Sequence, residues 1–343
     1  MRTNQIYFKT PIQRVKMALI DSHGRQINYV RLAVTDRCNL RCTYCMPQHG
    51  IDFVRRDDLL SYEEIIRLLK IFKSLEVTKL RITGGEPLVR KDLLPFLKTV
   101  TDQDIMPGFH LTTNATLTLP HIQELIDTGL QSVNISLDTL DKQRFIDITR
   151  RDHLDDVLAS INAFYQLDVP IKLNMVVSKG MNEQDIIPMA EYARHHKIQI
   201  RFLEEMPFNG LNEPKSDFMT HHDIKKVLDT HLPDLIPIPF KEGETSQNYQ
   251  VSGWKGDVGI IASYSRTFCG SCNRLRVTPT GQLKTCLYGK NELSLRTHLR
   301  NGSSDKEIAQ KIRDAVQQKP VDGFAAEAGR FDTVLESMAS IGG

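Results

Sequence analysis

Six segments of the chain alternate apolar and polar residues with the period of two that is typical of β-strands: 30–35, 79–83, 109–114, 132–138, 171–177 and 198–204. Between them, apolar residues at three-to-four spacing predict helices, most clearly over residues 62–75 and 153–167. Ser61 and Glu64 form a capping-box pattern at the start of the first helix. Alternating strands and helices predict a parallel sheet with right-handed crossovers. Because a closed barrel needs eight such units, we predict an α/β fold with an open, partial (βα)6 TIM-like barrel.

The polar positions of these strands predict a basic interior. Side chains point to opposite faces in turn, so the apolar face packs on helices and the polar face lines a lumen. Arginine and lysine recur on that polar parity, opposed chiefly by Asp138: Arg31, Lys79, Arg81, Lys172 and Arg201. Clustered, desolvated cations need a counter-anion, and arginine suits phosphates, so a highly anionic ligand is predicted. An ordinary antiparallel sheet with one solvated face is the alternative, which the helical segments between the strands disfavour.

After about residue 207 the pattern changes. The proline-rich segment 231–240 and the polar segment 241–247 predict a linker and a loop. Residues 274–287 predict a hairpin that turns at Pro279–Gly281, and residues from Asp305 predict a helix followed by a loose tail. We therefore predict two domains: residues 1–235, which include an N-terminal arm, and a smaller C-terminal domain, 236–343.

Composition narrows the classes of partner. The 343 residues include 44 basic and 42 acidic side chains, so the net charge of +2 does not indicate a nucleic-acid partner. No apolar run reaches the roughly 18 residues that span a membrane. The basic, serine-free start of the chain predicts a surface arm rather than a transit peptide, and it lacks the apolar region of a secretory signal. Six cysteines without such a signal favour metal binding in a reducing, cytoplasmic compartment over disulfides. Monomer and homodimer both stay open.

The cysteines form two groups of three. Cys38, Cys42 and Cys45 follow the first predicted strand, at the edge where βα barrels hold their active sites. Soft thiolates select zinc or iron–sulfur clusters, and a cluster of four irons held by three cysteines keeps one iron open to a ligand. The second group is Cys269, Cys272 and Cys286. Like the first group, it has three ligands, one fewer than a closed site of four. A zinc site completed by a distant ligand, such as His221 or His222, is the alternative for such a triad.

The first triad, with Tyr44 before its last cysteine, resembles the radical S-adenosylmethionine superfamily. Seven segments, in order along nearly the whole chain, resemble the GTP 3′,8-cyclase family, which opens molybdenum cofactor biosynthesis: 21–47, 80–93, 111–118, 132–140, 201–207, 268–278 and 340–343. The resemblance implies two [4Fe-4S] clusters and S-adenosylmethionine as cofactors. It implies GTP as substrate and (8S)-3′,8-cyclo-7,8-dihydroguanosine 5′-triphosphate as product. It also implies a flavodoxin-like electron donor and a downstream cyclic pyranopterin monophosphate synthase.

The resemblance assigns roles to single residues. The cluster ligands are Cys38, Cys42, Cys45, Cys269, Cys272 and Cys286. The contacts to S-adenosylmethionine are Tyr44, Gly85 of the TGGEP motif, Ser136 and Met206. The GTP contacts are Arg31, Lys79, Arg81, Thr112, Lys172, Arg274 and Arg276, and we expect Arg31, Arg81 and Arg201 to act in catalysis. The Gly342–Gly343 tail reaches into the active site in this family, whereas a disordered tail is the plain alternative.

Two departures from the family pattern fall in residues 319–324, where the family often has a histidine, and in residues 112–115, which replace a version that ends in glycine. Two rival functions follow from the motifs. One is another radical enzyme with an auxiliary cluster, such as a peptide-modifying one, although those often carry more C-terminal cysteines. The other is a zinc-stabilised binding module without catalytic chemistry.

Overall fold

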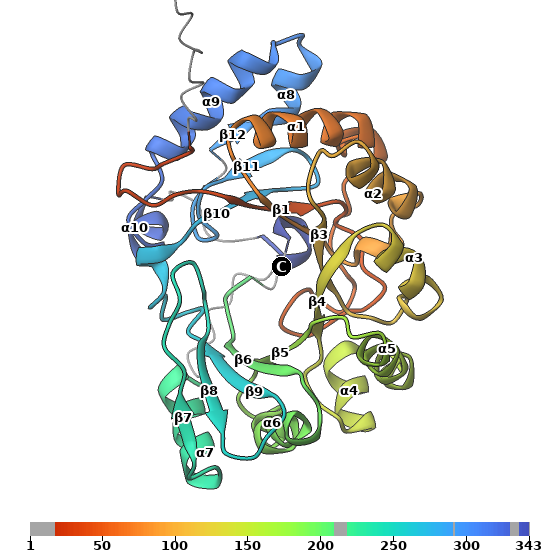
Figure 1. Ribbon diagram of the computed structural model, residues 1–343, viewed down its shortest axis with the longest axis vertical. Helices are drawn as coiled ribbons and strands as arrows, with labels where there is room; N and C mark the ends of the chain where they lie inside the picture. The colour runs from red at the N-terminus through yellow and green to blue at the C-terminus, as the bar shows by residue number, and fades with distance from the viewer. Residues whose placement is uncertain (1–17, 209–217, 291, 330–335, 343) are drawn as a thin grey trace, which may run out of the picture.

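One continuous sheet forms the centre of the molecule. The computed structural model describes residues 18–208, 218–290, 292–329 and 336–342, so the predicted N-terminal arm and Gly343 lie outside the described residues. Twelve strands follow the order β12-β11-β10-β1-β2-β3-β4-β5-β6-β9-β8-β7 and curve around a central space, with the helices outside them (Figure 1). Since the sheet runs from β12 at one edge to β7 at the other, the barrel is open, as predicted.

The six predicted strands form the middle of this sheet, with these bounds: β1 (Tyr29–Ala33), β2 (Lys79–Thr83), β3 (Phe109–Thr113), β4 (Leu130–Ser136), β5 (Ile171–Val177) and β6 (Gln199–Glu204). Each pairs in parallel with the next, which excludes the antiparallel alternative. Leu80 and Ile82 of β2 are buried against the helices, and both are at most 1% exposed. Arg81 between them points the other way into a cavity, so the predicted parity is confirmed.

Helices cover the outside of the barrel, and α1 and α5 confirm the helices predicted over residues 62–75 and 153–167. Their bounds are α1 (Tyr62–Ser74), α2 (Leu93–Asp102), α3 (Ile122–Asp127), α4 (Lys142–Thr149), α5 (Leu154–Gln166) and α6 (Ile186–His195), with short 3-10 turns η1 (Arg56–Asp58), η2 (Pro87–Val89), η3 (Leu119–His121) and η4 (Glu183–Asp185). The predicted capping box begins α1, where Glu64 N donates to Ser61 Oγ at 3.2 Å and Ser61 N donates to the Glu64 carboxylate at 2.8 Å. The buried face of α1 includes Leu68 and Phe72, each contributing about 1.5–3 kcal/mol of hydrophobic stabilisation.

The C-terminal strands extend the same sheet at both edges: β7 (Leu235–Pro237), β8 (Gln247–Val251), β9 (Asp257–Ile261), β10 (Arg274–Val277), β11 (Gln282–Lys284) and β12 (Leu293–Ser294). Strands β9 and β10 pair in parallel with β6 and β1, and antiparallel hairpins follow outward. The predicted hairpin over 274–287 is thus present as β10 and β11. The predicted linker over 231–240 is wrong in part, because its middle pairs with β8 as edge strand β7. The predicted boundary at 235/236 falls inside that strand, and the division into two domains stays a prediction.

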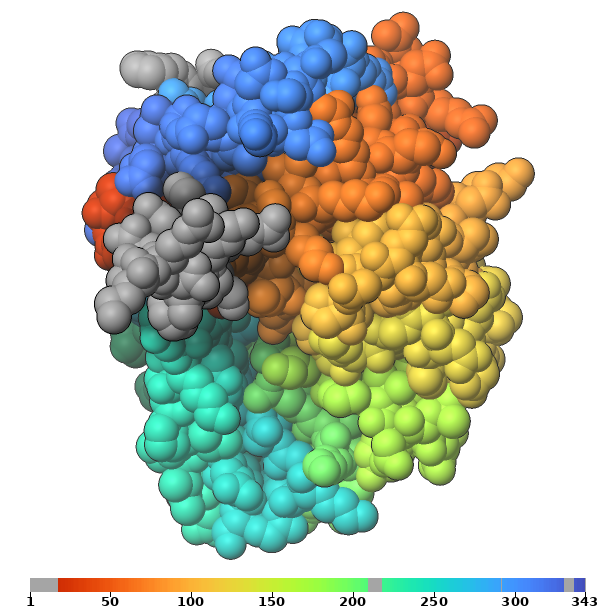
Figure 2. Space-filling view, turned by 45° about the horizontal axis from the view of Figure 1, so that its top comes forward, coloured from red at the N-terminus to blue at the C-terminus, as the bar shows by residue number. Residues whose placement is uncertain are grey.

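The last helices are α7 (His221–His231), α8 (Leu295–Arg300), α9 (Asp305–Gln317), α10 (Gly323–Ala328) and α11 (Met338–Ile341). Helix α7 packs against α6, β6 and β9 at the end of the barrel, whereas α9 packs back on its start. Helix α9 buries Ile308 and Ile312, and it lies against α1. Figure 2 agrees, since the blue C-terminal part of the chain lies directly on the orange N-terminal part of the barrel. This packing brings the C-terminal cysteines to the barrel. No helix among the residues described is long and apolar enough to cross a membrane.

Candidate active site

A cavity of about 440 Å³ occupies the space inside the sheet. Polar side chains from the central strands line it, and so do all six cysteines: Cys38, Cys42, Cys45, Cys269, Cys272 and Cys286. None of the six forms a disulfide. The two triads, more than 220 residues apart in sequence, therefore face one shared chamber.

The first triad lies in the loop that follows β1. Arg41 N in this loop donates to Thr149 O at the end of α4 at 3.0 Å, which holds the loop against the barrel. Burial raises the pKa of all three thiols, that of Cys38 to about 12. Ionising three such thiols together requires a strongly positive partner, so the donor set of Cys38, Cys42 and Cys45 fits a metal cluster. Among the described residues, no group of three or more His, Cys, Asp or Glu is arranged to hold a single metal ion.

The glycines of the TGGEP motif let two backbones meet beside this triad. Gly85 N donates to Thr35 O at 2.9 Å, and Glu86 N donates to Arg37 O at 2.9 Å. A Cβ atom on Gly85 would lie 2.4 Å from Arg37 O, closer than a real contact permits. Glycine at 85 is therefore required by the approach of the cysteine loop, besides any contact with a ligand.

Glu86 of the same motif is fully buried and organises the end of β3. Its carboxylate accepts hydrogen bonds from Thr113 Oγ1 at 2.9 Å and from Asn114 N at 2.8 Å. Burial raises the pKa of Glu86 to about 7, although these donors favour the carboxylate. Asn114 in turn directs its amide to Cys38 Sγ at 3.7 Å. The motif thus supports the first triad through β3 as well as through the loop.

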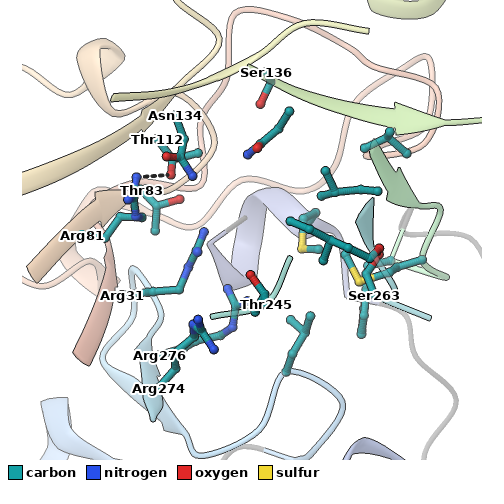
Figure 3. A pocket seen from close by; sticks show the side chains of 18 of the residues that line it. Arg31, Arg81, Thr83, Thr112, Asn134, Ser136, Thr245, Ser263, Arg274 and Arg276 are labelled. Carbon is teal, nitrogen blue, oxygen red and sulfur yellow. Dashed lines mark hydrogen bonds between the residues drawn. The ribbon is translucent and has the colours of Figure 1, made fainter. Parts of the chain in front are cut away.

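The floor of the cavity is strongly basic. The predicted GTP-contacting side chains line it together: Arg31, Lys79, Arg81, Thr112, Lys172, Arg274 and Arg276, with Arg201 beside them. Figure 3 shows Arg31, Arg274 and Arg276 on one side of the cavity and Arg81 bonded to Thr112 on another. Strands β1, β2 and β10 are in register, so Arg31 lies between Arg81 and Arg276 in adjacent strands.

Burial is the main reason why the pKa values of these cations are low. The pKa is lowered to about 9 for Arg31, about 10 for Arg201 and about 8 for Lys172; neighbouring cations act in the same direction as burial, and nearby acidic groups offset the shift only in part. The Oδ1 atoms of Asn134 and Asn174 also lie buried in this cavity without a partner among the described residues. The arrangement fits a ligand that brings several negative charges and some donors.

Tyr29 lies on this floor beside Arg31, on the same face of β1, and was missed because the predicted strand began one residue later, at Val30. Arg81 Nε donates to its hydroxyl oxygen at 2.7 Å. Burial raises the pKa of Tyr29, but Arg81, Arg31 and Arg274 outweigh burial and lower it to about 7. Glu244 and Asp257 supply further negative charge beside Lys172.

Asp138 does not oppose the cations, so that prediction is wrong. Its carboxylate accepts hydrogen bonds from Tyr44 OH at 2.8 Å and from Val176 N at 2.9 Å. The prediction extended the alternation of this strand to Asp138, but β4 ends two residues earlier, at Ser136. The direction of the Asp138 side chain is therefore not set by the strand. Asp138 instead fixes Tyr44, one of the four residues predicted to contact S-adenosylmethionine. All four line the same cavity as the first triad: Tyr44, Gly85, Ser136 and Met206.

The second triad is held by groups from distant parts of the chain. Cys269 begins the 3-10 turn η5 (Cys269–Ser271), Cys272 follows it, and Cys286 comes after β11. Arg25, paired with Asp21 at 2.6 Å, donates to Cys269 O at 3.0 Å. His221 and His222, the candidates for a fourth zinc ligand, line a neighbouring cavity, where His221 bonds Glu204 at 2.9 Å.

Comparison with known proteins identifies the family. Residues 32–193 match the model of the radical SAM superfamily, and residues 198–324 match that of molybdenum cofactor synthesis C. A protein of Syntrophomonas wolfei named GTP 3′,8-cyclase is 41% identical over 88% of this chain and 93% of its own length. Another of that name from Heliobacterium modesticaldum is 39% identical over 95% of this chain and 100% of its own length. This chain belongs to the GTP 3′,8-cyclase family.

Longer relatives and solved structures agree with this family. Molybdenum cofactor biosynthesis protein 1 of Dictyostelium discoideum is 41% identical over 94% of this chain, which spans about half (52%) of that protein. Streptococcus suis SuiB, solved with the precursor peptide SuiA, has a TM-score of 0.55 at 13% identity, over 90% of this chain and 69% of that chain. The native anSMEcpe structure with bound AdoMet has a TM-score of 0.51 at 16% identity, over 81% of each chain. These two likenesses show that this chain shares their fold.

In this member of the GTP 3′,8-cyclase family, the segment 336–342 enters the cavity. The prediction of a loose tail is therefore wrong for these residues. Ser337 Oγ donates to Cys45 O at 2.7 Å, and Arg276 donates to Gly342 O. Gly342 has φ +80°, and a Cβ atom there would lie 2.9 Å from Ala33 Cβ. Figure 1 shows α11, the dark blue end of the described chain, in the middle of the barrel. The sequence pattern contained no signal for Ser337 or Arg25, whose partners lie more than 240 residues away.

Proposed function

We propose that this chain converts GTP to (8S)-3′,8-cyclo-7,8-dihydroguanosine 5′-triphosphate, the first step of molybdenum cofactor biosynthesis. The observation that carries the proposal is the single chamber that both cysteine triads and the basic floor line together. Each feature alone suits many proteins, whereas the three around one cavity suit a nucleotide held between two clusters. Relatives that carry this name match the chain over nearly all of their own length.

The basic floor would bind the triphosphate. Arg31, Arg81 and Arg276 lie side by side on three paired strands, so they present a row of donors with little freedom to move. Binding of a polyanion would relieve the mutual repulsion that lowers the pKa of Arg31. Rigid strands would position the ribose more precisely than loops would.

The two triads would hold [4Fe-4S] clusters, and the residues around the first would hold S-adenosylmethionine. When bound, this pair supplies a 5′-deoxyadenosyl radical for hydrogen abstraction. Tyr44, Gly85, Ser136 and Met206 all line the cavity, and Asp138 keeps Tyr44 in place through a hydrogen bond of 2.8 Å. The second triad lies by Arg274 and Arg276, where it would receive the guanine.

The proposed reaction joins C3′ to C8 within one GTP molecule, so the protein must fix the ribose and the base relative to each other. The basic floor would fix the phosphate end and the second triad the base end. The segment 336–342 lines part of the cavity, where Ser337 donates to Cys45 O and Arg276 donates to Gly342 O. Its presence there would help to exclude water from a reactive carbon centre.

The same role implies a flavodoxin-like electron donor and a downstream cyclic pyranopterin monophosphate synthase. A reducing, cytoplasmic compartment would suit the six free cysteines. The C-terminal part, with its own cluster, would act as the smaller functional unit of residues 236–343, although its strands share the sheet of the barrel.

The test is anaerobic incubation of the purified chain with GTP, S-adenosylmethionine and a strong reductant, followed by mass spectrometry. We expect 5′-deoxyadenosine and an isomer of GTP in equal amounts. Cys42→Ser should abolish both products, because it removes a ligand of the first cluster.

Two outcomes would refute the proposal. Formation of deoxyadenosine without an isomer of GTP would indicate another radical enzyme, such as a peptide-modifying one. A colourless protein that contains zinc and no iron after anaerobic purification would indicate the binding module instead.

A further inference from the structure

Lys319 is a buried lysine that joins the two segments of the second triad. It follows α9 and is 3% exposed. Its ammonium group donates to Arg274 O, two residues after Cys272, at 3.3 Å, and to Thr285 O, next to Cys286. One side chain thus connects the backbone of both limbs that carry the auxiliary cysteines.

Among the residues that the structure describes, no carboxylate forms an ion pair with the ammonium group of Lys319. The nearby buried Lys284, by contrast, pairs with Glu336 at 2.7 Å. Lys319 and other nearby lysines favour the charged form of Glu292. Burial outweighs them, however, and raises the pKa of this carboxyl. A buried ammonium group that is solvated by two carbonyls alone is costly. An anionic group beside it would compensate this cost.

Cations contact the backbone of both limbs of the second triad, and Lys319 supplies one of them through Arg274 O and Thr285 O. Arg25 adds a second cation on the same side, since it donates to Cys269 O at 3.0 Å. The two triads therefore differ in their surroundings: buried carboxylates lie near the first and cations near the second.

We propose that Lys319 is a positioning residue for the auxiliary cluster, which sets both the spacing of its two cysteine limbs and its reduction potential. The inference rests on the proposed function, in that the second triad holds an iron–sulfur cluster. A cluster with three thiolates carries net negative charge, and reduction adds another electron. A buried cation beside it favours the reduced form and raises the potential.

The test isolates this cluster in the full chain by Cys38→Ser, Cys42→Ser and Cys45→Ser. Iron content and the midpoint potential, followed by electron paramagnetic resonance during a redox titration, are then compared with and without Lys319→Met. We expect the ratio of reduced to oxidised cluster at a fixed applied potential to fall about tenfold in Lys319→Met, which is about 59 mV for one electron. Lys319→Arg keeps the charge and should keep the potential.

A matched control is the double variant Lys284→Met with Glu336→Gln, which removes a buried ammonium group together with its carboxylate. Its net charge is unchanged, so its potential should stay at the starting value. If Lys319→Met does not fold, Lys319→Gln against Lys319→Arg makes the same comparison of charge.

An unchanged potential in a cluster-loaded Lys319→Met protein would overturn the role of Lys319 and leave the proposed function intact. Absence of iron from the triple-serine chain with Lys319 present would overturn the auxiliary cluster itself and, with it, this inference. A loss of thermal stability with no change in potential would reduce Lys319 to a structural tie.

Discussion

Gly85→Ala should damage the first triad through the backbone, without touching a cysteine. The new Cβ would lie 2.4 Å from Arg37 O and 2.8 Å from Asp36 O, both of which are main-chain atoms that cannot rotate away. The loop must move, which strains the two backbone hydrogen bonds of 2.9 Å that Thr35 O and Arg37 O accept.

The size of the effect follows from these contacts. Losing two hydrogen bonds costs about 1 kcal/mol each, and overpacking costs about 1–3 kcal/mol. The smaller entropy of unfolded alanine returns about 0.4–1 kcal/mol. We expect Gly85→Ala to lower the free energy of unfolding by about 2–4 kcal/mol, as measured by urea titration of the metal-free chain.

Gly270→Ala is the matched control, because it lies beside Cys269 and a Cβ atom there meets nothing within 4 Å. Its free energy of unfolding should change by less than about 1 kcal/mol. In a chain whose second triad is replaced by serine, Gly85→Ala should also lower the iron content and the affinity for S-adenosylmethionine. Equal stability and equal iron in Gly85→Ala and the starting chain would refute the close approach as the reason for this glycine.

Arg81→Met should weaken GTP binding about 10- to 100-fold, because hydrogen bonds to charged groups contribute about 1.5–3 kcal/mol. Titration calorimetry measures this change in Kd. An unchanged Kd in a folded variant would contradict the proposed position of the triphosphate. Tyr29, with a pKa of about 7 in the free site, ionises as pH rises and opposes the triphosphate. Because the bound triphosphate would raise that pKa again, binding takes up a proton, and affinity should fall about fivefold from pH 7 to pH 8. Tyr29→Phe should reduce the fall in GTP affinity between pH 7 and pH 8. Above pH 8, affinity should fall in both proteins, because Lys172, with a pKa of about 8, loses its charge. The same fall between pH 7 and pH 8 in both proteins would show that Tyr29 is not its cause. Glu86→Gln should cost about 1–3 kcal/mol of stability, because Leu88 N and Asn114 N donate to different oxygens of the Glu86 carboxylate, and the single amide oxygen of glutamine leaves one of these donors unpaired; an unchanged urea midpoint would show that the carboxylate is dispensable.

The sequence pattern predicted correctly those features that depend on residues close together in the chain. The capping box at Ser61 and the alternation around Arg81 both depend on neighbours within a few residues, and both are present as predicted. The same reasoning failed at Asp138, because nothing in the alternation marks where β4 ends. It also missed Tyr29, because the predicted strand began at Val30 and β1 begins one residue earlier, on the face that carries Arg31.

The sequence by itself determined the parallel strands, the basic parity of their inner face and the spacing of the two cysteine triads, since side-chain direction in a strand and short loops are set by adjacent residues. Only the tertiary structure decided that β10 pairs with β1, that both triads face one cavity, and that Lys319 and Ser337 hold the cysteine segments. Those contacts join segments up to 292 residues apart, and hydrogen bonds across such separations depend on how whole layers pack, which no local pattern encodes.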